Sequence, residues 1–141
     1  MTSPDSELRK YLQSLTVLAA GVGSDRVMVY DRVPETDNYP YIYISDINNA
    51  DMGTKDQTIW DVELLLDIVT GYNNKGGGRK TADLIGNNVL TALLDSPYAD
   101  IGEYYISMAT LVNSNYLDED APDNYIVRKL LRINFQIEKQ P

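Results

Sequence analysis

Residues 60–68 read WDVELLLDI, a run in which apolar and acidic side chains alternate with a period of two. Every even position is apolar, whereas the acids Asp61, Glu63 and Asp67 occupy odd positions. Because successive side chains of a β-strand point to opposite faces, this run predicts a strand with one buried face and one hydrated face. Such a strand needs neighbours in a sheet, and the sequence supplies candidates on both sides of it.

A second strand is predicted just before this run. Residues 40–44, PYIYI, combine β-branched and aromatic residues with a proline at a position where a strand tolerates it. The intervening residues 48–57 are polar and contain Gly53. We therefore expect the two strands to form a long hairpin with a substantial tip.

Two further strands are predicted near the end of the sequence. Over residues 125–137, apolar residues alternate with basic or amide residues such as Arg128 and Arg132. This pattern predicts a long strand. Residues 104–112 predict another strand that weakens towards its end, and residues 113–124 are expected to form a second polar tip.

Two amphipathic helices and one short strand complete the prediction. A helix begins near Ser3 and Pro4 and ends near Gly21 or Gly23. Its apolar stripe is Leu8, Tyr11, Leu12, Leu15 and Leu18. Residues 26–30 form a short β-rich run, followed by a loop around Pro34. After a glycine- and asparagine-rich break at residues 71–78, the second helical stripe is Ala82, Ile85, Val89 and Leu93.

These elements predict an α+β fold in a single domain over residues 1–141. Strands that follow one another through hairpins pair antiparallel. We therefore expect a mainly antiparallel sheet of about four to five strands, with the two helices packed on one face.

The composition excludes several classes of function. Asp and Glu number 21 against 12 Lys and Arg, so the net charge is −9. This charge disfavours tight binding to nucleic acid or to an anionic membrane, because both attract clustered cations. With no Cys and no His, thiolate nucleophiles and Cys-based zinc sites are excluded, and the commonest general base is missing. We expect no cofactor, no metal and no enzymatic activity.

The sequence also carries no pattern of export or membrane insertion. Residues 1–10 are acidic where a secretory signal is basic and then apolar. The apolar runs are far shorter than the ~20 residues that a membrane span requires. We expect a soluble protein made in the cytoplasm.

The segment from Gly71 to Thr81 is the strongest candidate for small-molecule binding. It lies between a predicted strand and a predicted helix, as a phosphate-binding loop does. However, Gly77 stands where that pattern requires Lys, and Arg79 intervenes before Lys80. We favour a flexible connection with basic residues at the helix start over nucleotide binding.

The acid run of residues 118–123 is a candidate for a hard cation. It contains Asp118, Glu119, Asp120 and Asp123. It lacks the glycine and the closing Glu of a calcium loop, so a solvated loop tip is the favoured interpretation. Acid and base catalysis by Asp61 and Glu63 is disfavoured in the same way, because acids on an exposed strand face keep an open sheet soluble.

Apolar residues on the hydrated side of the sheet predict a partner surface. Either Tyr41 and Tyr43 or Ile42 and Ile44 must face away from the helices, and further apolar residues share polar strand faces: Leu65, Ile126 and Leu130. The 11 tyrosines, against one Phe and one Trp, suit a protein interface. The alternative is a scatter of single surface hydrophobes, which is normal on monomers.

The layout resembles the tail completion proteins of long-tailed bacteriophages, the tail terminator or tail-to-head joining family. The residues that carry the resemblance are a leucine-rich first helix, Arg26-Val27, Val33-Pro34, Pro40-Tyr41-Ile42-Tyr43-Ile44, Trp60, a glycine-rich turn, Leu93-Leu94, Arg128, Leu131, Arg132 and Phe135. Together they span nearly the whole chain.

The resemblance implies a structural virion protein without catalytic residues. It implies an α+β subunit that assembles with itself into a hexameric ring on the head-proximal end of the tail tube, ends tube polymerisation and contacts the head connector. Its partners would be the tail tube protein and the neck proteins, and genomic DNA would pass through the bore without tight binding. Assembly would take place in the bacterial cytoplasm, with the finished protein in the neck or tail of the virion.

The residues expected at the interfaces lie on predicted strand faces and polar tips. They are Tyr41, Tyr43, Asn48, Asn49, Asp51, Met52, Lys55, Tyr72, Asn73, Asn74, Lys75, Asn115, Tyr116, Asp118, Glu119 and Asp120.

Three alternatives remain open from the sequence. The chain could be another neck or tail component, such as a connector adaptor or a tube subunit. It could be a small phosphate- or nucleotide-binding protein that uses Lys75, Arg79, Lys80 and Thr81. It could also be a monomeric adaptor that binds a host protein through its tyrosine-rich face.

Overall fold

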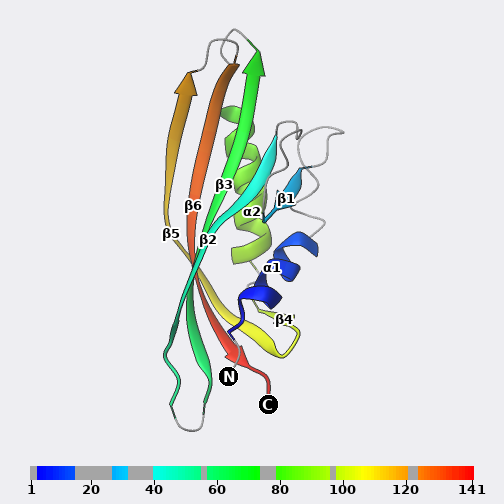
Figure 1. The fold of residues 1–141 in the computed structure, drawn as a ribbon, viewed down its shortest axis with the longest axis vertical. Helices are drawn as coiled ribbons and strands as arrows, with labels where there is room; N and C mark the ends of the chain where they lie inside the picture. The colour runs from blue at the N-terminus through cyan, green and yellow to red at the C-terminus, as the bar shows by residue number, and fades with distance from the viewer. Residues whose placement is uncertain are drawn as a thin grey trace.

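The computed structural model of the chain describes residues 3–14, 27–31, 40–54, 57–73, 79–95, 98–120 and 124–141. These residues contain two helices and six strands (Figure 1). They are α1 (Asp5–Ser14), β1 (Met28–Tyr30), β2 (Tyr41–Asp51), β3 (Ile59–Asn73), α2 (Lys80–Leu94), β4 (Ala99–Ile101), β5 (Tyr104–Asp120) and β6 (Asn124–Lys139). The predicted residues Leu15, Leu18, Gly21, Gly23 and Pro34 lie outside the described part.

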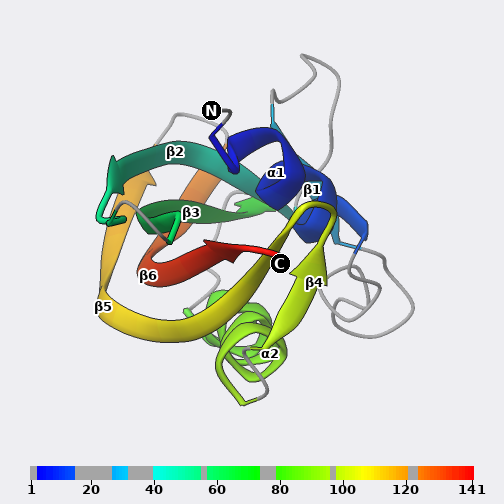
Figure 2. The same cartoon turned by 90° about the horizontal axis from the view of Figure 1, so that it is seen from below.

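The strands form one mixed sheet in the order β1-β2-β3-β6-β5-β4. β1 pairs parallel with β2, and every other neighbouring pair is antiparallel. Seen end-on, the sheet curls around the core (Figure 2). The prediction of four to five antiparallel strands was therefore wrong. A strand of three residues, such as β4, is too short to show a period of two, and the parallel pairing of β1 is a long-range contact that local pattern does not encode.

The two long hairpins differ from prediction in opposite ways. The hairpin of β2 and β3 is confirmed, but pairing extends to Asp51 and Trp60, so its tip is shorter than expected. Residues 113–120, predicted to be a polar tip, instead continue β5, which stays paired with β6 as far as Asp120 and Tyr125. Residues 113–119 of β5 are exposed on both faces. Strand alternation is therefore absent there, and backbone pairing alone defines the strand.

The core lies on the concave side of the sheet. It is built by alternate residues of β3 and β6, whose fully buried side chains include Val62, Leu64, Leu66, Ile68, Leu131, Ile133, Phe135 and Ile137. The predicted stripe of α2 is confirmed, because Ala82, Ile85, Val89 and Leu93 are all buried. In α1, Leu8 and Leu12 are buried. Ile42 and Ile44 face the same core from β2, which turns Tyr41 and Tyr43 outward.

The sequence predicted that both helices pack on one face of the sheet. In the structure, the two helices do not form one simple layer. α2 packs against β3, β5 and β6, whereas α1 contacts β1 and β4. β1 and β4 are the two end strands of the sheet order, so α1 lies between the ends of the curled sheet (Figure 2). The curl brings these two strands to one helix, which a flat sheet would keep apart.

Candidate interaction surfaces

The paired strands carry candidate interface residues to both ends of an elongated body (Figure 1). The turn between β2 and β3 lies at one end of the long axis. The paired ends of β5 and β6 lie at the other, beside the end of β3. The sequence predicted polar tips, and the structure separates them by the length of the sheet.

The β2–β3 end presents a short turn with an exposed apolar side chain. The Gly53 backbone amide donates a hydrogen bond to the Asp51 carboxylate at 2.8 Å, and the Met52 amide donates to the Ile59 carbonyl at 2.9 Å. The Met52 side chain is 59% exposed beside this turn. On the last half of β2, Asn49 donates to the carboxylate of Asp5 at the start of α1. Asn48 is exposed, and Lys55 lies outside the described residues.

The opposite end gathers candidate residues from two separate stretches of sequence. Tyr72 of β3 and Asp120 of β5 both pair with Tyr125 of β6, so the ends of β3 and β5 flank the same strand. Asn73 is the last residue of β3. Asn74 and Lys75 lie outside the described part. The sequence placed these groups in separate loops, and the register with β6 brings them to one end of the sheet.

The start of α2 is attached to this end by an ion pair and an aromatic contact. The Arg79 guanidinium lies 3.0 Å from the Asp118 carboxylate and 4.2 Å from the centre of the Tyr116 ring. The hydrogen bond with Arg79 lowers the pKa of Asp118, and the same bond raises the pKa of Arg79. Arg79, one of the residues considered for phosphate binding, therefore binds a carboxylate of β5.

A second polar contact joins α2 to the inner face of the sheet. The Tyr116 hydroxyl donates to the Asp83 carboxylate, and the Lys129 ammonium donates to the same carboxylate at 2.9 Å. These bonds, first from Tyr116 and then from Lys129, lower the pKa of Asp83. Burial acts to lower the pKa of Lys129, but its bonds to Asp83 and Tyr116 outweigh burial and the pKa is raised. The two contacts fix α2 against β5 and β6.

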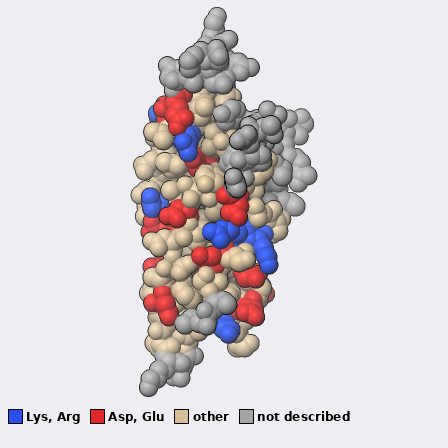
Figure 3. Space-filling model, in the orientation of Figure 1, with Lys and Arg blue, Asp and Glu red and all other residues tan. Residues whose placement is uncertain are grey.

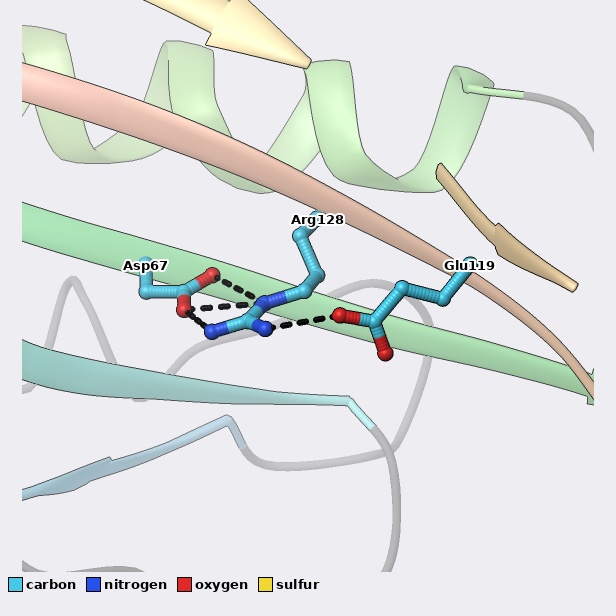
Figure 4. Close-up of polar contacts among 3 residues, drawn as sticks. All are labelled: Asp67, Glu119 and Arg128. Atoms are coloured by element: carbon cyan, nitrogen blue, oxygen red, sulfur yellow. Dashed lines mark hydrogen bonds and ion pairs between the residues drawn. The ribbon is translucent and has the colours of Figure 1, made fainter. Parts of the chain in front are cut away.

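On the outer face, Arg128 bridges two carboxylates from different strands (Figure 4). Its Nε lies 3.0 Å from the Asp67 carboxylate, its second terminal nitrogen donates to the same group, and the other terminal nitrogen lies 2.9 Å from Glu119. The Asp67 side chain is 1% exposed. The bond to Asp67, opposed by burial and reinforced by Glu119, raises the pKa of Arg128. The contact links β3, β6 and β5 at one level.

The acids of β3 that the sequence placed in solvent bond across to β6. Arg132 donates to the Glu63 carboxylate, and the Asn134 amide donates to Asp61 at 2.7 Å. On the face drawn in Figure 3, acidic and basic residues are intermingled. Paired acids of this kind stabilise the sheet face and do not point to acid and base catalysis.

The tyrosine face is less exposed than the sequence suggested. Tyr41 and Tyr43 are half-buried on the outer face, and the Tyr41 ring lies edge-on to Tyr30 with ring centres 6.1 Å apart. The apolar residues predicted to mark a partner surface are also half-buried: Leu65, Ile126 and Leu130. Neighbouring side chains within the chain thus cover part of this surface.

Sequence reasoning missed three exposed apolar side chains of β5. Met108 is 55% exposed, Val112 50% and Leu117 47%. Asn115 is exposed on the same strand, and Glu119 is held by Arg128. A signal was present in the sequence, because residues 107–117 contain no charged residue and no proline.

The described residues give no support to a metal site or a membrane span. Among them, no group of three or more His, Cys, Asp or Glu is arranged to hold a metal ion. None of the described helices is long and apolar enough to cross a membrane.

The family model of "Tail completion protein gp17" matches residues 6–137. The chain belongs to this family. The suspected resemblance is thereby confirmed, and the protein is a structural component of the bacteriophage tail, located in the virion. A tail component associates with other tail or head proteins.

A solved structure shares the fold of this tail completion protein. It is a chain of the "Virion of native gene transfer agent (GTA) particle", with a TM-score of 0.75 and 20% sequence identity. The similarity covers 98% of this chain and 99% of that chain. No curated protein sequence matches the chain.

Proposed function

We propose that this tail completion protein caps the head-proximal end of the tail tube as a hexameric ring, ends tube polymerisation and joins the tail to the head connector. The observation that supports the proposal most is the family match over residues 6–137. The function then depends on shape and surface contacts between protein subunits, with no catalytic step.

The elongated body supports a role between two different partners. In a ring with the long axis of each subunit along the tail, the β2–β3 turn would face one partner and the β5–β6 end the other (Figure 1). The β2–β3 turn offers an exposed apolar group in Met52. The other end offers the acids Asp118 and Glu119, both already paired with arginines. The two ends therefore differ in chemistry, as contacts with a tube and with a connector would require.

The charge of the chain fits passage of DNA through such a ring. Six copies would carry about 54 formal negative charges, nine from each chain. A negatively charged ring repels phosphates and offers no cluster of cations for them to bind. Genomic DNA would then move through the bore without adhering to it.

The proposal is tested with purified protein and isolated tail tubes. Native mass spectrometry and negative-stain imaging should show rings, either free or on one end of each tube. Met52→Asp should abolish binding to the tube or to the connector, because it replaces the exposed apolar side chain of the turn with a charged one. Leu84→Asp is the matched control, since Leu84 is 41% exposed on α2 and lies in neither turn.

The outcomes separate the proposal from its alternatives. A protein that stays monomeric and binds neither tube ends nor connector would contradict it. Binding to the connector without any effect on tube length would instead identify a neck adaptor.

A further inference from the structure

One edge of the sheet is open along most of a long strand. β4 pairs only with Tyr104–Ile106 of β5. Among the described strands, none pairs with that side of residues 107–120. An edge of this length presents a row of unpaired backbone donors and acceptors, which other chains can extend. Natural proteins protect such edges with charged residues, prolines or bulges.

Along residues 107–117, the open edge of β5 lacks the first two kinds of protection, charged residues and prolines. Over the whole sequence, by contrast, 23% of the residues are charged. Seven large hydrophobic residues of the described part are exposed, and four of them lie on this strand: Met108, Val112, Tyr116 and Leu117. Two register shifts, between Ile106 and Met108 and between Leu111 and Asn113, interrupt it. A neutral, apolar edge is typical of a strand that is covered when the protein is assembled.

A second open edge lies on the other side of the same sheet. β1 pairs only with Tyr41–Tyr43 of β2. Within the described part of the chain, residues 44–51 of β2 have a strand neighbour on one side only, which is β3. In the described part of the chain, β2 over residues 44–51 and β5 over residues 107–120 therefore each have a strand neighbour on one side only.

The two edges are open at the same level of the sheet. Thr110 of β5 pairs with Asn134 of β6, Asn134 pairs with Glu63 of β3, and Glu63 pairs with Asn48 of β2. These residues form one row across the strands, on the outer face, because directly opposed residues of antiparallel strands share a face. The neighbouring rows run from Met108 to Ala50 and from Asn113 to Asp46. Neither β1 nor β4 covers the sheet at these three rows.

The strand directions also suit a contact between copies. β2, β3, β6 and β5 alternate in direction, so β5 runs antiparallel to β2. A neighbouring copy that is rotated about an axis along the strands keeps its orientation and presents its β2 antiparallel to β5. Two chains of net charge −9 repel each other, and a neutral strand is where they can approach with least repulsion.

We propose that the open edge of β5, at residues 108–113, pairs antiparallel with the open edge of β2, at residues 46–50, of a second copy of this chain. The sheet then continues from subunit to subunit through backbone hydrogen bonds. Each copy offers one edge of each kind, which makes a heterologous contact that closes into a ring. The inference rests on the proposed ring, and it assigns the strands that form its subunit interface.

Disulfide trapping tests this pairing, and the absence of native cysteine removes any background. Asn48→Cys is combined in turn with Met108→Cys, Thr110→Cys or Asn113→Cys. Directly opposed residues in antiparallel strands have Cα atoms about 4.5–5.5 Å apart, within the range that a disulfide spans. Mild oxidation of assembled virions and of purified protein, followed by non-reducing electrophoresis, should give a ladder of covalent oligomers for at least one of the three pairs. The pair with the strongest ladder reports the register.

The controls separate the edges from other surfaces. Each single-cysteine variant should remain monomeric on the gel. The pair Met52→Cys and Leu84→Cys, both exposed and outside the two edges, should give no ladder. Covalent dimers from Thr110→Cys alone would show that two β5 strands pair with each other, which would overturn the inference.

A charge exchange provides a second readout that does not depend on disulfide geometry. Asn113→Asp places a carboxylate in the row of Asp46 of the next copy, and like charges directly opposite each other weaken strand pairing. Association measured by sedimentation or native mass spectrometry should weaken roughly fivefold, with an unchanged melting temperature. Asn113→Asp combined with Asp46→Lys should restore it.

The results also separate this inference from the proposed function. Rings that form normally but give no ladder with any of the three pairs, and no response to Asn113→Asp, would overturn the edge pairing and leave the ring intact. Absence of any oligomer in solution and on tube ends would overturn the ring and the pairing together.

Discussion

Removal of the Arg128 side chain should destabilise the protein more than any other single ion-pair change on the outer face. The Asp67 carboxylate is 1% exposed and accepts hydrogen bonds from two nitrogens of Arg128. In Arg128→Met, this carboxylate stays buried without its cation. Methionine fills the space of the apolar part of the arginine side chain, so the loss of stability comes mainly from the missing charge.

The expected loss is about 2–3 kcal/mol of unfolding free energy. Removing one partner of a buried ion pair costs roughly 3–5 kcal/mol. Arg128 itself is 31% exposed, so water compensates in part and the loss lies at or just below the lower end of that range. The bond to Glu119, which is 45% exposed, adds at most a few tenths of a kcal/mol. For a chain of this size, the change corresponds to a fall in Tm of roughly 10 °C.

Urea unfolding monitored by circular dichroism at neutral pH measures this loss, with Arg132→Met as the matched control. Arg132 lies on the same face of β6, and its partner Glu63 is 38% exposed, so its removal should cost less than about 1 kcal/mol. The double variant Asp67→Leu with Arg128→Met should recover most of the stability, because it leaves no buried charge. Equal and small losses for Arg128→Met and Arg132→Met would refute the reasoning.

Two further changes probe the helix attachment and a tight turn. The pKa of Asp83 is lowered in the folded protein, so its stabilising effect is present above its usual pKa near 3.8 and is lost as pH falls through the lowered value. Asp83→Asn should therefore flatten the decline of unfolding free energy below about pH 4, and an unchanged acid slope would contradict this contact. Gly102 has φ +70°, and an added Cβ would lie 2.5 Å from the Glu7 carboxylate. Gly102→Ala should cost roughly 1–2 kcal/mol in thermal or urea unfolding, whereas no loss would mean that the turn relaxes.

The sequence predicted well wherever side-chain burial alternates along a strand or helix. The even positions of residues 60–68 and the stripe from Ala82 to Leu93 face the core because burial selects apolar residues at each period. The same logic failed for residues 113–119, where both faces of β5 are exposed and no period is selected. It also failed for β4, which is shorter than two periods.

The sequence predicted where some of the candidate surface residues lie in the fold, but not where others lie. The polar turn at Met52 was anticipated from composition. The attachment of Arg79 to Asp118 was not, since 39 residues separate them and the packing of α2 against β5 brings them together. The row of paired residues from Thr110 to Asn48 could not be predicted either, because it depends on three separate strand registers.

The sequence by itself determined the apolar faces of β3, β6 and α2, how strongly the chain is charged, and which family it resembles, because each of these follows from residue type and local spacing. The tertiary structure alone decided the strand order, the curl that brings β1 and β4 to α1, and the two edges left open at one level. Strand pairing is formed by backbone hydrogen bonds, and backbone groups are the same in nearly every residue, so local residue type and spacing do not show which strands become neighbours.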